Sequence, residues 1–224
     1  MIEIGNTATH NDQGAGDTFA FDSGSGSNRI LIIGFANYDE TVNDRQVSAI
    51  TYGGQSLTKH TASVADNATD SGRSELWYLI NPPTGSNNVA ITFAGANDIA
   101  NSDLFLAIFT GVDQGTPIDT GSGSTTVQGT QDRITLTTTI DDCMLVDVNN
   151  GNAGPMTIGA GQTSLLDASG STGRGSYKLV AGAGNYNMDM DRTANDDFAH
   201  SALALTPYVA PPIATGNFFS LFGL

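Results

Sequence analysis

The pattern of two β-strands joined by a turn is clearest in RSELWYLINPPTGSNNVAITFAG, residues 73–95. Within it, residues 88–93 alternate between small or polar side chains and large apolar ones, the period of a strand with one buried face. The first half carries apolar bulk on both faces. Residues 81–86, in between, contain two prolines and a glycine, which interrupt a β-ladder and favour a turn. We therefore expect a hairpin here, with Trp77, the only tryptophan, as an anchor in the core of a β-sandwich.

Short strands separated by turns are expected along most of the chain. Two stretches, 29–37 (RILIIGFAN) and 103–112 (DLFLAIFTGV), are apolar on both faces, as central strands of a sheet are. The Gly-Gly pair at 53–54 has the composition of a tight hairpin turn, and a second hairpin is expected around 140–142. No stretch shows a helical period over ten or more residues. The pattern therefore predicts an all-β fold over residues 1–207, an antiparallel, jelly-roll-like β-sandwich.

The charge balance excludes several classes of partner. The 224 residues include 23 Asp and Glu but only 8 Lys and Arg, for a formal net charge of −15. Binding to nucleic acid or to an anionic membrane needs clustered cations, so neither partner is expected. No apolar run approaches the roughly 20 residues that span a bilayer. The single cysteine, Cys143, allows no intrachain disulfide, and we expect no secretion signal in the first residues.

Two stretches interrupt the strand pattern. Residues 118–132 are rich in Gly, Ser and Thr, and we expect a long, mobile loop there. The 208–224 segment begins as a proline-containing, extended linker and ends in the apolar tail NFFSLFGL. Chain ends are usually polar, so this composition predicts a tail that is buried against something. Its candidate partner-binding residues are Phe218, Phe219, Leu221, Phe222 and Leu224.

The size of the burial term indicates how such a tail would act. Burying five large apolar side chains contributes roughly 8–15 kcal/mol at about 1.5–3 kcal/mol each. Ordering some eight residues costs about 1–2 kcal/mol apiece, so the two terms nearly cancel. A single tail would bind weakly, and it becomes effective when several tails act together or a neighbour already holds the domain. We favour docking on another subunit over the alternative, an edge strand added to the tail's own sandwich.

No pattern of a known catalytic site is present. The sequence lacks the Gly-x-Ser-x-Gly motif of hydrolases, and Cys143 lies in an apolar strand, where a buried thiol is inert. Glycoside hydrolysis needs two opposed carboxyl groups, and no glutamate cluster suggests them. We therefore expect no enzymatic activity. The three histidines and three glutamates are scattered along the chain, without the spacing of a metal site or a carboxylate cluster: His10, His60, His200, Glu3, Glu40 and Glu75.

One acidic stretch is a candidate calcium site. Asn185, Asn187, Asp189 and Asp191 alternate with apolar residues, which places their oxygen-bearing side chains on one face of a strand. Ca²⁺ prefers such oxygen ligands, and Asn187, Asp189 and Asp191 are the tentative metal ligands. The spacing does not fit an EF-hand loop. The alternative is a solvated strand face with the intervening methionines in the core.

Five segments carry a resemblance to a known family: NRILIIG (28–34), VSAITYGGQSLT (47–58), ELWYL with NPPTG (75–85), FTGVDQ (109–114) and SYK (176–178). In this order they resemble a poorly characterised β-sandwich domain of bacterial surface proteins and of tailed-phage virion structural proteins. The similarity runs from about residue 17 to residue 207. These motifs are structural rather than catalytic, so the resemblance implies the fold and a role in assembly.

Together these observations predict a non-enzymatic virion structural protein, a phage capsid decoration (cement) or fibre-type subunit. It would fold in the host cytoplasm, assemble as a homotrimer or larger ring, and dock through its tail on a shell or tail protein. The alternative is a glycan-binding, lectin-like module, with or without calcium, in which Tyr38, Tyr186 or Tyr208 stacks on a host-surface glycan. A third interpretation is a filament subunit that donates its tail to a neighbour's sheet.

Overall fold

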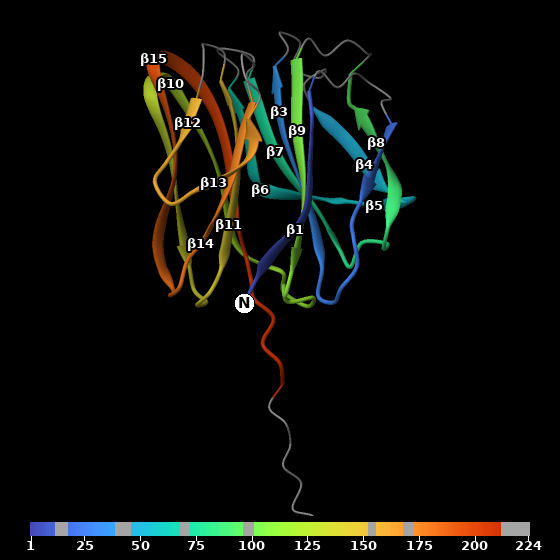
Figure 1. Ribbon diagram of the computed structural model, residues 1–224. Coiled ribbons are helices and arrows are strands. Elements are labelled where there is room, and N and C mark those ends of the chain that lie inside the picture. The colour runs from blue at the N-terminus through green and yellow to red at the C-terminus, as the bar shows by residue number, and fades with distance from the viewer. Residues whose placement is uncertain are drawn as a thin grey trace, which may run out of the picture.

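The computed structural model describes residues 1–11, 18–38, 46–67, 72–95, 101–151, 156–167 and 173–211 (Figure 1). Within these ranges the chain forms β-strands and no helix. The strands are β1 (Glu3–His10), β2 (Thr18–Asp22), β3 (Ile30–Tyr38), β4 (Val47–Tyr52), β5 (Gln55–Ser56), β6 (Thr58–Asn67), β7 (Gly72–Ile80), β8 (Ser86–Phe93), β9 (Asn101–Thr110), β10 (Ile118–Thr138), β11 (Met144–Gly151), β12 (Met156–Ile158), β13 (Thr163–Asp167), β14 (Gly173–Leu179) and β15 (Gly184–Leu205).

The first nine strands form two antiparallel sheets that face each other. One has the order β1-β9-β3-β7-β6 and the other β2-β8-β4-β5. Apart from β6, this is the strand order of a jelly roll, because the chain passes back and forth between the sheets. The predicted all-β, antiparallel, jelly-roll-like sandwich is confirmed.

The two predicted hairpins around 81–86 and 140–142 are wrong. β7 pairs with β3 and β6, whereas β8 pairs with β2 and β4, so the intervening turn crosses from one sheet to the other. Asn81 and Gly85 both have positive φ, and the Asn81 amide donates to the Arg29 carbonyl instead of to β8. Likewise, β10 and β11 each pair with β15 and not with each other. Alternation identifies a strand but not its partner.

The remaining strands form a second unit around the long pair β10–β15. A straight strand of 21 residues would be about 70 Å long. Yet the Thr139 amide, just beyond the end of β10, donates to Asp119 near its start, at 2.7 Å. The pair therefore folds back on itself, at register shifts between Thr126 and Gln131. Residues 131–138 of β10, 184–192 of β15 and β12 form what we call the folded-back layer, over the outer face of β11 and residues 198–205 of β15.

The glycine-rich stretch 118–132 belongs to β10, so the loop expected there is wrong. Its glycines allow β6 to approach closely. A Cβ on Gly121 would lie 2.4 Å from Ser63 Oγ, and one on Gly123 would lie 2.1 Å from the Val64 carbonyl oxygen. The glycines that suggested a loop are thus required by the close packing of β10 against β6.

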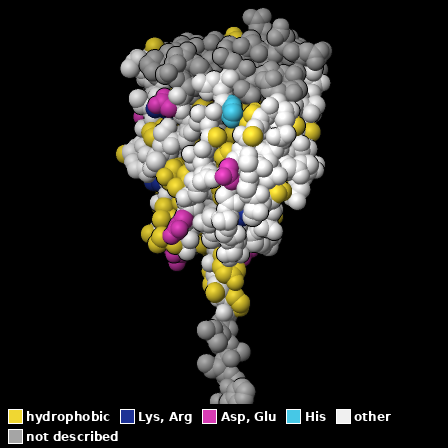
Figure 2. All heavy atoms as spheres, turned by 45° about the vertical axis from the view of Figure 1, so that its right-hand side comes forward, with side chains coloured by type: hydrophobic (Ala, Val, Ile, Leu, Met, Phe, Trp, Pro, Cys, Tyr) yellow, Lys and Arg dark blue, Asp and Glu magenta, His cyan; other side chains and the backbone are white. Residues whose placement is uncertain are grey.

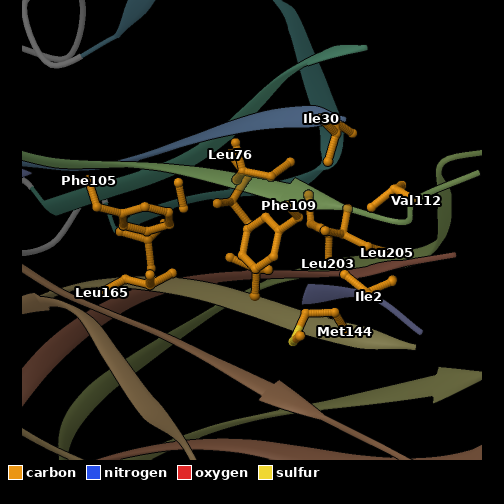
Figure 3. Packing of buried hydrophobic residues seen from close by; sticks show 14 of the residues in the cluster. Ile2, Ile30, Leu76, Phe105, Phe109, Val112, Met144, Leu165, Leu203 and Leu205 are labelled. Atoms are coloured by element: carbon orange, nitrogen blue, oxygen red, sulfur yellow. The ribbon is translucent and has the colours of Figure 1, made fainter. Parts of the chain in front are cut away.

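The five-stranded sheet is buried on both faces. Trp77, 4% exposed, packs in the core between it and the four-stranded sheet. The opposite core, shown in Figure 3, joins it to β11, β14 and β15. There the ring of Phe105 lies against two glycines, Gly34 of β3 and Gly175 of β14, whose added Cβ atoms would be 2.3 and 2.7 Å from it. The two units are therefore packed through one continuous core.

The variant Gly34→Ala should destabilise the protein by about 2–3 kcal/mol, because the new methyl group overlaps the Phe105 ring. Urea unfolding measures this change, and adding Phe105→Leu should recover part of it. Gly182→Ala is the matched control, since its Cβ would lie 3.9 Å from the nearest atom. Equal stability of the two single variants would contradict the packing described.

Candidate functional site

The N-terminal residue and the last described residues meet at one end of the body, which we call the base. Val112 and Pro207 form a β-bridge, and the Tyr208 amide donates to the Gly111 carbonyl at 2.7 Å. Gly111 has φ +71°, and a Cβ there would lie 2.5 Å from the Met1 carbonyl oxygen. Met1 and Tyr208 therefore flank the same residue. Figure 1 shows the chain leaving the body here.

The exposed apolar side chains of the described chain are concentrated at the base. Met1 is 76% exposed, Tyr208 40% and Val209 76%. Leu179, 42% exposed, lies opposite Met144, which in turn pairs with Leu205, close to where the chain leaves. In Figure 2 hydrophobic side chains cluster around this exit. The base thus combines an apolar surface with the start of the 208–224 segment.

Residues 208–211 are exposed throughout and do not fold back onto the sheets. They run away from the body in Figure 1. The predicted partner-binding residues Phe218, Phe219, Leu221, Phe222 and Leu224 lie outside the described residues. Their docking stays a prediction. The described residues of the segment, 208–211, point away from the body.

Four aspartates lie at the base, in its turns or at the start of β10. Asp113 accepts bonds from the Gly115 and Thr116 amides, which lower its pKa. Asp119 accepts a hydrogen bond from the Thr139 amide, and Asp141 accepts one from the Ala183 amide, each at 2.7 Å. The fourth, Asp142, is exposed. Burial raises the pKa of the neighbouring Cys143 thiol to about 11, with added contributions from three of these carboxylates, so the thiol stays protonated.

The candidate calcium ligands lie together on one strand face, but each has a protein partner. In the folded-back layer, Thr135 Oγ1 donates to Asn187 at 2.9 Å and Gln131 Nε2 to Asp191 at 2.7 Å, while Arg133 pairs with Asp189. Met188 and Met190 point into the core. Among the described residues no group of three or more His, Cys, Asp or Glu is placed to hold a metal ion. The geometry therefore favours a cross-strand polar ladder.

The structure assembles a buried charge cluster that sequence spacing did not indicate. His200 Nε2 lies 3.0 Å from Asp147 Oδ2, and its Nδ1 lies 3.4 Å from Asp132 Oδ2. Asp147 also accepts from the Ser176 amide and hydroxyl, at 2.8 and 2.6 Å. Asp132 comes from the folded-back layer and Asp147 from β11, so His200 ties the two layers. The three residues are 15 to 68 positions apart in sequence, and only the strand pairing brings them together.

Neither Ser176, near His200, nor Ser63, which contacts His60, has the arrangement of a catalytic dyad. Ser176 bonds to the carboxylate of Asp147 and not to His200, and all three side chains are fully buried. His60 Nδ1 lies 2.7 Å from Ser63 Oγ, but that hydroxyl is buried and donates to the Ala202 carbonyl at 2.6 Å. A nucleophile needs both an accessible oxygen and a base that takes its proton.

A second charged cluster surrounds Trp77. Its indole Nε1 donates to Glu75 Oε2 at 3.0 Å, and Lys59 Nζ lies 2.8 Å from the same oxygen. The Lys59 ammonium lies 4.7 Å from the Trp77 ring centroid, and Arg73 pairs with the other Glu75 oxygen. The fully buried Glu75 is thus neutralised by two cations, and the cluster links β6 to β7.

The three tyrosines considered for glycan stacking lie on separate parts of the molecule. Tyr38 ends β3, far from the base, whereas Tyr208 lies at the base. Tyr186 packs against the core of the folded-back layer, and its hydroxyl donates to the Gly182 carbonyl. They form no common platform, and the glycan-binding alternative stays a prediction.

No family model and no curated protein matches the chain. In the described ranges no helix is long and apolar enough to cross a membrane. Any inference about function therefore rests on the sequence and the geometry of the chain itself.

The stability of the protein should fall as the pH rises from 6.5 to about 9. Burial alone lowers the pKa of His200, but Asp132 and Asp147 outweigh it and raise the pKa to about 9. The protonated ring therefore adds about 3 kcal/mol to the free energy of unfolding below pH 6.5. This contribution decreases as the pH rises and is gone above about pH 9. Urea unfolding at pH 6 and pH 9 measures it.

The variant His200→Gln should lose this pH dependence. His60→Gln is the control, because burial lowers the pKa of His60 and it titrates below this range. If His200→Gln does not fold, NMR titration of the wild-type His200 ring replaces it, and a midpoint near 6.5 would contradict the assignment.

Calcium should leave the thermal unfolding midpoint unchanged to within about 1 °C, since the ladder oxygens already accept protein hydrogen bonds. Thermal unfolding with 1 mM CaCl₂ and with EDTA checks this. A calcium-dependent rise that Asp189→Asn abolishes would instead identify a metal site.

Proposed function

We propose that this protein is a non-enzymatic structural subunit of a virion, a capsid decoration or fibre-type protein that docks through its 208–224 segment. The observation that carries the proposal is the course of residues 208–211, which leave the base exposed and directed away from the body. The apolar sequence NFFSLFGL follows them. A segment of this composition needs a surface to bury it, and its described beginning leads away from the protein's own sheets.

The body has the properties of a rigid support. The buried charged side chains of the Glu75 and His200 clusters are paired with oppositely charged groups and so serve the fold. Apolar cores on both faces of the five-stranded sheet join it to the other sheets. Such a body suits a subunit that holds a fixed position in an assembly and does not change conformation.

Deleting residues 212–224 tests the proposal. The truncated protein should unfold at the same urea concentration as the full chain, because the proposal places the segment on a partner and not on the protein's own sheets. It should lose binding to virus particles that lack their own copies, measured as copies bound per particle. A control variant keeps the length but carries serine at Phe218, Phe219, Leu221, Phe222 and Leu224, and should also fail to bind. Full occupancy by either variant would overturn the proposal.

A further inference from the structure

The side chains of the segments that form the base include carboxylates but no Lys or Arg. The segments 111–119, 139–143, 180–184 and 206–211 contain four aspartates and no Lys, Arg or Glu. Hydrogen bonds make these segments one surface: the Asp113 amide donates to the Thr206 carbonyl, Thr139 to Asp119, and the Asp142 amide to the Ala181 carbonyl. Acidic side chains lie just above the chain exit in Figure 2.

The same surface holds the exposed apolar side chains Met1, Tyr208 and Val209, with Leu179 nearby. Exposed apolar groups that gather on one face of a soluble protein mark an interaction site. Here they coincide with the point where the docking segment leaves. The body would therefore come close to any surface on which the segment is anchored.

The negative charge of the base favours some binding partners for this face over others. A second copy meeting it base to base would bring eight carboxylates together, four from each, on chains of net charge −15. Like charges facing each other across an interface oppose association. A surface rich in Lys and Arg would instead neutralise them. The carboxylates of Asp113, Asp119 and Asp141 are held in fixed positions by backbone donors, which favours directed pairing with cations.

We propose that the base is the docking face of the body, and that its partner is an apolar protein surface bordered by Lys and Arg side chains. This inference rests on the proposed function and adds the chemistry of the partner and the orientation of the body. The segment supplies apolar anchoring, while the base supplies charge-dependent attraction. The opposite end of the jelly roll, where Tyr38 pairs with Gly72 and Asn101, faces away from the partner.

The test compares two variants of the full chain that carry the same net charge. The base variant is Asp119→Asn, Asp141→Asn and Asp142→Asn, in which the asparagines at 119 and 141 keep an acceptor oxygen for the Thr139 and Ala183 amides. The control variant is Asp167→Asn, Asp189→Asn and Asp191→Asn, on β13 and the folded-back layer. Each has a formal net charge of −15 + 3 = −12. Urea unfolding verifies that both variants fold.

Binding is measured on the same virus particles, at 50 and 300 mM NaCl. The base variant should bind about tenfold more weakly than the control at 50 mM NaCl, from three exposed charge pairs. Its affinity should also depend less on salt, since fewer ion pairs are screened.

Equal affinities of the two variants would overturn the inference while leaving the proposed function standing, provided that the truncated chain still fails to bind. Tighter binding by the base variant would overturn the inference, because the aspartates would then oppose docking. Dimerisation of the base variant in sedimentation experiments would overturn it in favour of a second copy as occupant. No binding by the wild-type chain would overturn both.

Discussion

Burial of the five-stranded sheet on both faces is the constraint on which the architecture depends. β3 is buried from Ile30 to Asn37, with only Tyr38 at its end half exposed, and the apolar side chains of β9 face both cores. A sheet of this kind is stable only when both faces are covered. The four-stranded sheet covers one face, and the unit of β10 to β15 covers the other. Removing either cover would expose a continuous apolar surface, so the two units are interdependent.

In the second unit, the folded-back pair β10–β15 helps to bury both faces of a strand. Ala202 and Ala204 of β15 face the folded-back layer, whereas Leu203 and Leu205 face the central sheet. The same strand is thus buried on one side by the folded-back part of its own ribbon and on the other side by the central sheet. Charged side chains inside a protein are costly unless they are paired and hydrogen-bonded. His200 bonds to Asp147 of the adjacent β11, but its pairing with Asp132 forms only when the ribbon is folded, which favours this one arrangement.

The sequence predicted the strands better than their partners. The two-sided strands at 29–37 and 103–112 were recognisable because a short run that is apolar on both faces is typical of a strand buried between two layers. The turn at 81–86 was recognisable too, but a proline-containing turn can join strands of one sheet or of two. The glycines of β10 suggested a loop, because their role depends on β6, which approaches from far away in the chain. His200 gave no signal, since its carboxylate partners are supplied by strand pairing. The base could not be predicted either, because it consists of turns that only the topology brings together.

The route by which the chain leaves the body has a mechanical consequence. The exit segment continues directly from β15, whose residues 198–205 are hydrogen-bonded to β10 on one side and to β11 on the other. A pull along this segment would load both ladders in shear, so that many hydrogen bonds resist together instead of opening one after another. An edge strand in the same position would peel away. A tether that emerges from an interior strand therefore transmits tension into the whole sheet without first unravelling its own attachment.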